Sequence, residues 1–197
     1  SCLGARLRYG RILVYDILVE VTTADWRKRD WVFSLKGRFL NDWDVKNAAR
    51  VCVAIEPGGW FKKPFWAYYW SSESPFDDLV RRHDLLGRQI SLQDHLFTVI
   101  GIIKEPPRDK DPRWFHWEDS ALLVPVTAYH RYLRSQRSYN PNNNPTAIDK
   151  IEADTGDGNT VGAAKHKIEA ILKRRHRGEE DFDIKDMREE IQGELNE

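Results

Sequence analysis

Residues 84–107, DLLGRQISLQDHLFTVIGIIKEPP, predict a β-hairpin near the middle of the chain. A short run at 89–92 is followed by the polar turn 93–95 and then by a mainly β-branched and aromatic run at 96–103. Two such runs around a short polar turn are typical of a hairpin. Because the second run is apolar almost throughout, we expect both of its faces to be covered by other parts of the protein.

Further helices and strands are expected on both sides of this hairpin. Before it, the patterns predict one long or two short strands at 9–21, a polar connection or helix start at 22–30, a turn at Gly37, a helical turn capped within 41–44, a strand at 51–55 and a helix at 75–82. After it, they predict a strand at 121–126, a helix at 128–137 capped by Thr127, and a β-α-β run at 147–185 with its helix at 161–177.

The length and charge of the chain limit the kinds of protein that it can be. The chain has 197 residues, which suits one domain or one domain with a sizeable inserted subdomain. Its 31 basic and 31 acidic residues give a formal net charge of zero, whereas nucleic-acid binders usually show a basic excess. No apolar run approaches the ~20 residues that span a bilayer. The start, Ser1-Cys2, has no signal-peptide pattern and no methionine, so we expect a fragment of a longer protein.

No motif in the sequence predicts an enzyme. The six histidines lack metal-ligand spacing with one another or with a cysteine, and Gly-rich phosphate loops and nucleophile signatures are missing. A hydrolase would need two carboxylates facing each other across a cleft, and the adjacent acids of this chain are typical of solvated surface. Cys52 lies in a buried-strand pattern, and we do not expect it to form a disulfide with Cys2. We therefore expect no catalytic residue, cofactor or metal.

Residues 57–74, PGGWFKKPFWAYYWSSES, hold seven aromatic residues in eighteen, and a second aromatic group follows at 114–117. Three hypotheses account for these groups: packing inside an inserted lobe, a surface for a partner or lipid, or a platform for carbohydrate. The candidate partner surface comprises Trp60, Phe61, Phe65, Trp66, Tyr68, Tyr69, Trp70, Trp114 and Trp117.

Several stretches resemble, in order, the motifs of one family. Residues 35–44, LKGRFLNDWD, are similar to its "Gly-Arg-Phe-Phe, then an acidic residue" element, and 86–103 to its "Leu-Gly-Lys/Arg-Xaa-Ile, then Phe-Thr-Val-Val-Gly-Val". Residues 123–127 resemble its Val-Pro strand and helix cap, and 168–187 its ending. The family is the periplasmic core domain of MacB-like (MacB, LolC and FtsX-type) ABC-transporter permeases. The matching structural positions are Gly37, Arg38, Phe39, Gly87, Arg88, Phe97, Gly101, Pro125, His176 and Phe182.

The resemblance implies an α+β fold with two lobes. A porter-like βαβ lobe would comprise residues 1–36 and 141–197, with its N-terminal part truncated. A smaller inserted α/β lobe, called Sabre in the family, would comprise residues 37–140 and contain the hairpin.

The resemblance also implies a function. It indicates a non-catalytic domain on the periplasmic, extracytoplasmic face of the inner membrane, anchored in the full-length protein by flanking transmembrane helices. Such a domain couples ATP hydrolysis in a separate nucleotide-binding domain or subunit to export or lipoprotein extraction. Its expected partners are a periplasmic adaptor (membrane fusion) protein or a lipoprotein cargo. The alternative is a stand-alone carbohydrate- or lipid-binding module that uses the Trp-rich segment 60–70.

Overall fold

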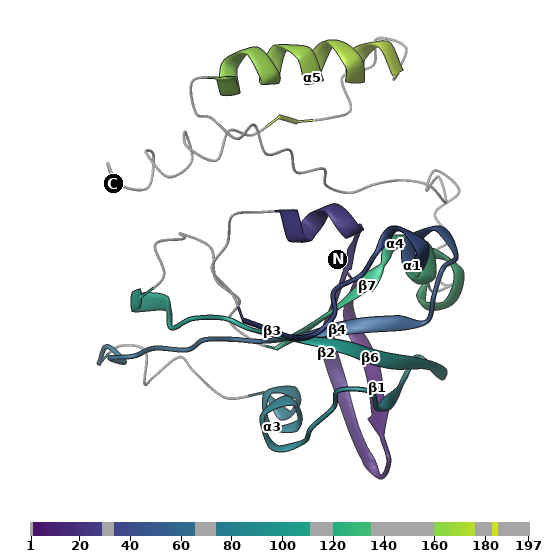
Figure 1. Ribbon diagram of the computed structural model, residues 1–197, viewed down its shortest axis with the longest axis vertical. Helices are drawn as coiled ribbons and strands as arrows, with labels where there is room; N and C mark the ends of the chain where they lie inside the picture. The colour runs from purple at the N-terminus through teal and green to yellow at the C-terminus, as the bar shows by residue number, and fades with distance from the viewer. Residues whose placement is uncertain are drawn as a thin grey trace. The chain divides into compact units, whose positions relative to one another are not determined.

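The computed structural model describes residues 2–28, 34–65, 74–110, 120–134, 160–175 and 183–184. The chain forms two compact units, Ser1–Asp149 and Lys150–Glu197, which are described separately. The first unit contains β1 (Cys2–Tyr9), β2 (Ile12–Thr22), η1 (Ala24–Lys28), β3 (Ser34–Gly37), α1 (Asp42–Lys46), β4 (Val51–Glu56), α3 (Pro75–Arg82), β5 (Gln89–Leu92), β6 (His95–Lys104), η2 (Arg108–Lys110), β7 (Ala121–Pro125), α4 (Val126–Ala128) and η3 (Tyr129–Leu133) (Figure 1).

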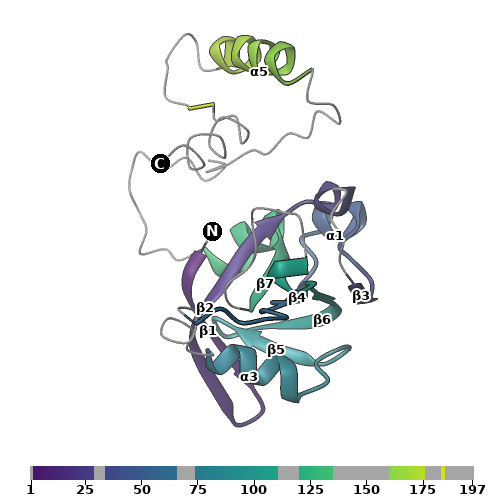
Figure 2. The same ribbon diagram turned by 90° about the vertical axis from the view of Figure 1, so that its left-hand side faces the viewer.

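The strands of the first unit form a sheet that closes on itself. The strand order is β3-β6-β4-β7-β2-β1-β5, and β5 also pairs with β6. The ring therefore runs β6-β4-β7-β2-β1-β5 and back to β6, with β3 paired to the part of β6 beyond β5 (Figure 2). The pairings β4–β6 and β2–β7 are parallel, and the other pairings are antiparallel. Closure leaves few unpaired strand edges, which protects the unit against edge-to-edge association.

The predicted hairpin is confirmed as β5–β6. Leu92 pairs with His95, so Gln93 and Asp94 alone form the turn. Both turn residues have positive φ, 47° and 68°, which is the backbone of a type I′ turn. This turn follows the right-handed twist of the strands and sets the register that directs Ile90 and Phe97 into the core.

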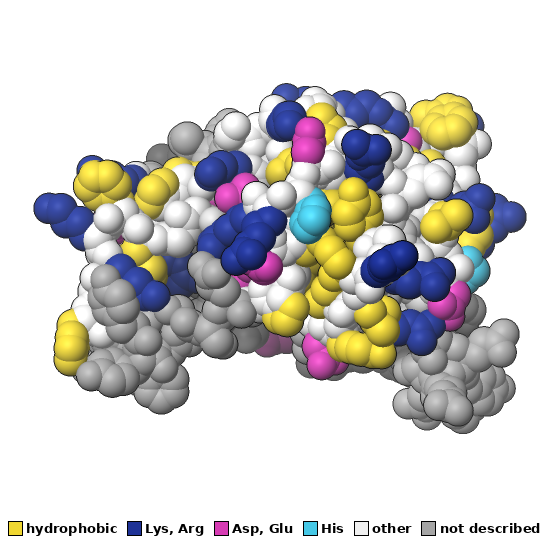
Figure 3. Space-filling view, turned by 90° about the horizontal axis from the view of Figure 1, so that it is seen from below, with side chains coloured by type: hydrophobic (Ala, Val, Ile, Leu, Met, Phe, Trp, Pro, Cys, Tyr) yellow, Lys and Arg dark blue, Asp and Glu magenta, His cyan; other side chains and the backbone are white. Residues whose placement is uncertain are grey.

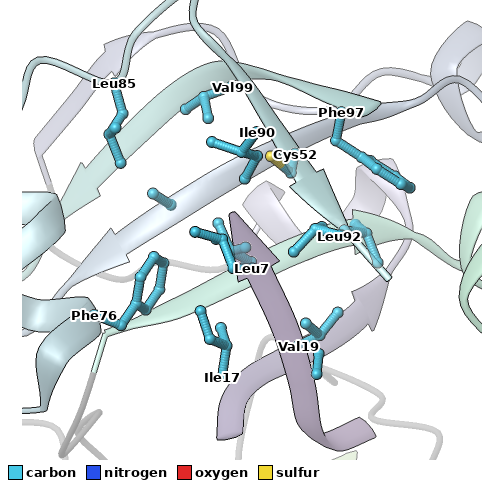
Figure 4. Packing of buried hydrophobic residues seen from close by; sticks show 14 of the residues in the cluster. Leu7, Ile17, Val19, Cys52, Phe76, Leu85, Ile90, Leu92, Phe97 and Val99 are labelled. Carbon is cyan, nitrogen blue, oxygen red and sulfur yellow. The ribbon is translucent and has the colours of Figure 1, made fainter. Parts of the chain in front are cut away.

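The larger hydrophobic core lies between one face of the sheet and α3. Phe76 from α3, Leu7 from β1 and Phe97 from β6 are all at most 2% exposed within it (Figure 4). The helix α3 spans the predicted residues, and a capping box starts it: the Ser74 side chain accepts from the Asp77 amide, and Asp77 accepts from the Ser74 amide. Burial of these large side chains supplies most of the favourable free energy of folding.

A second, smaller core covers the opposite face of the same strands. It contains Val53, Ile55 and Ile103, packed with Phe39 from the segment before α1. Trp26 of η1 stacks on Phe39 with a ring-centroid distance of 5.3 Å. The strands β4, β6 and β7 are therefore covered on both sides, as predicted for β6 from its continuous apolar run.

The grouping of residues 1–36 differs from the predicted one. β1, which covers residues 2–9 and was not predicted, pairs with β2 and β5, and β2 pairs with β7. Residues 2–22 thus belong to the same sheet as strands drawn from 37–140. The physical reason is burial: Ala5 and Leu7 are at most 1% exposed, and only pairing within this sheet covers them.

The helix after β7 also differs from its prediction. It begins at Val126, and its described part continues as the π-helical η3 up to Leu133. Thr127 lies inside the first turn, and its hydroxyl donates to the Val45 carbonyl rather than capping the helix. The amide of Arg134 donates to the Tyr129 carbonyl, the spacing of a π-helix.

The described part of the second unit consists mainly of α5 (Val161–Arg175), which confirms the predicted helix up to Arg175. None of its side chains is buried, and Lys173 pairs with Glu169 at 3.0 Å. The predicted strand at 147–153 and the helix end at 177 lie outside the described residues. Of the strand predicted at 181–185, the described residues 183–184 have no regular secondary structure.

Candidate functional site

The described residues present no arrangement for catalysis. Among them, no group of three or more His, Cys, Asp or Glu side chains could hold a metal ion. The two best pockets have volumes of about 160 and 170 Å³, below the range typical of small-molecule sites. The Cys52 thiol is free and fully buried, and burial raises its pKa, so that it is not poised as a nucleophile.

The family-motif residues gather around β6. The Gly37–Gly101 pair brings β3 against β6 so closely that side chains are excluded on both strands. A Cβ atom at Gly37 would lie 2.4 Å from the Ile100 carbonyl oxygen, and one at Gly101 would lie 2.3 Å from the Arg38 carbonyl oxygen. Gly37 also has a φ of +83°, which favours glycine. We call this close approach the glycine contact.

The second motif joins β6 at Val99, one residue before Ile100, whose carbonyl accepts from the Arg38 amide of the first motif at 2.9 Å. The Gly87 amide donates to the Val99 carbonyl at 2.7 Å, and the Val99 amide donates to the Arg88 carbonyl at 2.9 Å. Two separate motifs therefore attach to consecutive residues of one strand. The two glycines have different physical reasons: Gly37 lies at the close approach, whereas a Cβ atom at Gly87 would meet open space, and it is the φ of +75° at Gly87 that favours glycine.

Arg38 and Phe39 of the first motif have different structural roles. Arg38 donates two hydrogen bonds to the Asp44 carboxylate, at 2.6 and 3.1 Å, and Asp44 is 1% exposed. Asp44 also accepts from the Asn41 amide and so completes the capping box of α1. Burial raises the pKa of the Asp44 carboxyl, but the hydrogen bonds from Arg38 and Asn41 outweigh this effect and leave the pKa below its ordinary value. Phe39 fills the second core.

The remaining described motif residues are also structural. Phe97 is fully buried and lies edge-on to Tyr132 at 6.4 Å. Pro125 ends β7 opposite Thr22 and precedes α4. His176 and Phe182 lie outside the described residues. None of the described motif positions forms a binding site by itself.

Two loop segments that are far apart in the sequence meet beyond the ends of β4 and β6. We call residues 57–65 and 105–110 the aromatic loop pair. The Asp109 carboxylate joins them, since it accepts from the Phe61 amide at 2.7 Å and from the Lys62 amide at 3.0 Å. The hydrogen bond from the Phe61 amide is the main cause that lowers the pKa of Asp109. At Gly58, a Cβ atom would lie 1.8 Å from the Pro106 carbonyl oxygen.

Basic side chains of one segment of this pair lie over aromatic rings of the other. Trp60 is half-buried beneath the Arg108 guanidinium, and the Lys110 ammonium lies 4.5 Å from the centre of the Phe61 ring. Phe61 and Phe65 are 62% and 77% exposed. The three described residues of the candidate partner surface thus lie on one loop. The other six, Trp66, Tyr68, Tyr69, Trp70, Trp114 and Trp117, lie outside the described residues.

Other exposed hydrophobic side chains are spread over the first unit. In the view from below, hydrophobic side chains lie among Lys and Arg side chains on the same face (Figure 3). Leu13 and Tyr15 on β2, Leu96 on β6 and Trp43 on α1 are between 46% and 65% exposed. Sequence analysis missed these positions, because they alternate with core residues in ordinary strand patterns. No helix within the described ranges is long and apolar enough to span a membrane.

Comparisons with known proteins agree with the motif assignment. The model of the family described as the MacB-like periplasmic core domain matches residues 3–171. No curated protein matches the sequence.

Solved structures with the same fold include two transporter domains. The periplasmic region of MacB from Actinobacillus actinomycetemcomitans has a TM-score of 0.60 and 17% identity, over 98% of this chain and 72% of that one. The extracellular domain of the noncanonic ABC-type transporter YknZ from Gram-positive bacteria has a TM-score of 0.56 and 12% identity, over 93% of this chain and 76% of that one. The family model covers most of the chain, and the chain therefore belongs to the MacB-like periplasmic core domains of ABC-transporter permeases.

Proposed function

We propose that this domain couples cytoplasmic ATP hydrolysis to export or lipoprotein extraction, and that it contacts a periplasmic adaptor protein or a lipoprotein cargo. The observation that carries the proposal is the family match over residues 3–171. The family consists of periplasmic domains of inner-membrane ABC permeases and is not one of known enzymes; the ATPase is a separate part. In the full-length protein, flanking transmembrane helices would hold the domain at the outer face of that membrane.

The packing of the first unit supports a role in transmitting movement. β6 pairs with three strands, and both of its neighbouring motifs bind it through backbone hydrogen bonds. Cores packed on both faces of the sheet leave little room for deformation. A displacement applied through the chain ends would therefore move this unit as one body.

The division of the chain supports the proposed porter-like lobe in part. Residues 150–197 form a compact unit apart from the closed sheet. We propose that residues 141–197 contribute to a porter-like lobe and that the sheet containing the hairpin represents the inserted lobe. Residues 2–22 pair within that sheet, although the family resemblance assigns them to the porter-like lobe.

The test replaces the domain in the full-length permease with a flexible linker. We expect the basal ATPase rate to persist, while export or lipoprotein release and copurification with an adaptor or lipoprotein are lost. A linker variant that still transports would contradict the proposal. The full-length permease with Phe97→Ala provides a milder test than the linker, because this change weakens the core of the domain and leaves the transmembrane part unchanged.

The alternative, a stand-alone carbohydrate- or lipid-binding module, draws support from the exposure of Phe61 and Phe65. It requires the isolated chain to act without a permease. A glycan and lipid array, repeated after Trp66→Ala and Trp70→Ala, separates the two proposals. Binding of a defined sugar that is lost in both variants would favour the module.

A further inference from the structure

The tip of the aromatic loop pair exposes two large apolar side chains. Phe65 is 77% exposed, the largest exposed fraction among the large hydrophobic residues that the structure describes, and Phe61 is 62% exposed. Both lie within five residues on one loop. A phenylalanine that could reach a core lowers the free energy of the folded state by entering it, so two exposed rings at one tip indicate a surface that is covered by something else.

Basic residues outnumber acidic residues around these rings. The chain as a whole is neutral. Apart from Glu105, which is buried, the charged residues of the aromatic loop pair are four basic residues and one acidic residue. The basic residues are Lys62, Lys63, Arg108 and Lys110. The acidic residue, Asp109, directs its oxygens at the amides of Phe61 and Lys62. The tip is therefore apolar and cationic together.

The backbone of the loop is held in place before any ligand binds. Asp109 fixes two successive amides, and the Arg108 amide donates to the Gly59 carbonyl at 2.8 Å. Gly58 permits a backbone approach to Pro106 that no side chain would allow. Because these contacts order the loop in advance, binding through Phe61 does not have to supply that ordering free energy.

We propose that the aromatic loop pair docks on the anionic phospholipid surface of a membrane. Phe61 and Phe65 enter the boundary between headgroups and acyl chains, and the four basic side chains meet the lipid phosphates. Aromatic rings flanked by Lys and Arg are the side chains that proteins use at this boundary. The inference rests on the proposed function, because a domain at the outer face of a permease lies beside such a surface, where an acylated cargo is also anchored.

The composition of the tip distinguishes a lipid surface from a protein partner. Protein interfaces are depleted of lysine at their centre, where desolvation of an ammonium is unfavourable. Here Lys62 and Lys63 lie between the two exposed rings in the sequence, and Lys110 lies over one of them. A lipid surface places phosphates and apolar chains within one side-chain length of each other. It can therefore bind the ammonium groups through the phosphates and cover the phenyl rings with the apolar chains. The expected affinity is modest, which suits a domain that its anchor already holds near the membrane.

The experiment measures cosedimentation of the 197-residue chain with vesicles of phosphatidylglycerol and, separately, of phosphatidylcholine. We expect binding to the anionic vesicles that weakens as salt increases. The double variant Phe61→Ala with Phe65→Ala should bind at least about tenfold more weakly. Each of Lys62→Gln and Lys63→Gln should lower binding by about fivefold.

The matched control is Trp43→Ala with Lys46→Gln on α1, because Trp43 is 65% exposed and Lys46 is an exposed basic residue three positions further along the same helix. This control should bind as the unchanged chain does. Three results would overturn the proposal. The unchanged chain could fail to bind anionic vesicles, or the control variant could lose as much vesicle binding as the loop variants. The third is binding to an adaptor protein that depends on the loop, without binding to vesicles. The linker experiment on the full-length permease has an independent outcome, so transport that persists in the linker variant, together with intact vesicle binding by the 197-residue chain, would count against the proposed function alone.

Discussion

One segment of the aromatic loop pair follows β6 directly in the chain, yet the strand and the loop pair use their aromatic residues in opposite ways, although glycine permits a close backbone approach in both. On β6, Phe97 is fully buried and Gly101 lets another strand approach. In the loop pair, Phe65 is mostly exposed and Gly58 lets two loops meet. The motif residues around β6 therefore stabilise the fold, whereas Phe61 and Phe65, which belong to none of these motifs, lie on the surface. What is specific to this protein is to be sought in the loops.

Replacement of a phenylalanine by alanine should give the largest difference in stability loss between β6 and the aromatic loop pair. Phe97→Ala removes a fully buried ring and should lower the free energy of unfolding by about 4 kcal/mol. Phe65→Ala, the same change at an exposed ring, should alter it by less than about 0.5 kcal/mol. Urea unfolding of both variants measures the difference. Similar losses in the two variants would contradict the assignment of Phe65 to the surface.

A methyl group placed in the glycine contact should have the next largest effect. Gly101→Ala directs a Cβ atom to within 2.3 Å of the Arg38 carbonyl oxygen, so β3 must move, and we expect a loss of about 3 kcal/mol. Gly162→Ala on α5 meets open space and should stabilise the helix, by up to about 1 kcal/mol. Thermal unfolding gives both values. An unchanged melting temperature in Gly101→Ala would show that β3 does not need this approach.

The buried ion pair behind the first motif should contribute less and should depend on pH. Asp44→Asn removes the charge that Arg38 binds and should cost about 2 kcal/mol at neutral pH. The pKa of Asp44 is lowered in the folded state, so its stabilisation is present above the ordinary carboxyl pKa and is lost as pH falls through the folded value. The difference between the two proteins should therefore shrink in acid.

The control for this pair is Asp42→Asn, an exposed acid in the first turn of the same helix, α1. Its effect should be at most about 0.5 kcal/mol, through the helix dipole alone. Equilibrium unfolding at several pH values measures all three proteins. A constant difference between Asp44→Asn and the unchanged chain down to the acid transition would exclude the ion pair as its source.

The smallest effect on global stability is expected at Asp109. Asp109→Ala removes the acceptor for the Phe61 and Lys62 amides, so hydrogen exchange at these two amides should become faster while the melting temperature stays the same. The pKa of Asp109 is lowered, so lowering the pH through its folded value should loosen the loop of the unchanged chain as well. Asp84→Ala, which removes an exposed acid paired with Lys36 at 3.2 Å, should leave both amides protected.

Local patterns predicted the elements whose signals lie within a few residues. The hairpin β5–β6, the helix α3 and the turn α1 with its Asn41 cap are all confirmed. These signals are short-range, since a cap or a tight turn is formed by residues three or four apart. The strand β1 was missed, because its alternation of Ala5 and Leu7 with arginines is weak without the partner strand that covers it.

The candidate site was predicted only as two separate aromatic segments. Trp60, Phe61 and Phe65 were identified as a possible surface, while the role of Asp109 had no signal in the sequence. Its function depends on a partner 48 residues away, at the Phe61 amide. An acid in a charged loop has the same local pattern whether it is solvated or binds another loop.

The sequence by itself determined the family, the hairpin, the Asn41 cap of α1 and the lack of a catalytic motif, because each of these depends on residue types at short fixed spacings. The tertiary structure alone decided that β5 closes the sheet between β1 and β6, that the two motifs attach to neighbouring residues of β6, and that residues 57–62 meet 105–110. These contacts join segments far apart in the chain. They form because together they bury apolar side chains and give the backbone N–H and C=O groups hydrogen-bond partners. A local sequence pattern cannot predict this, because the contributing residues are far apart in the chain.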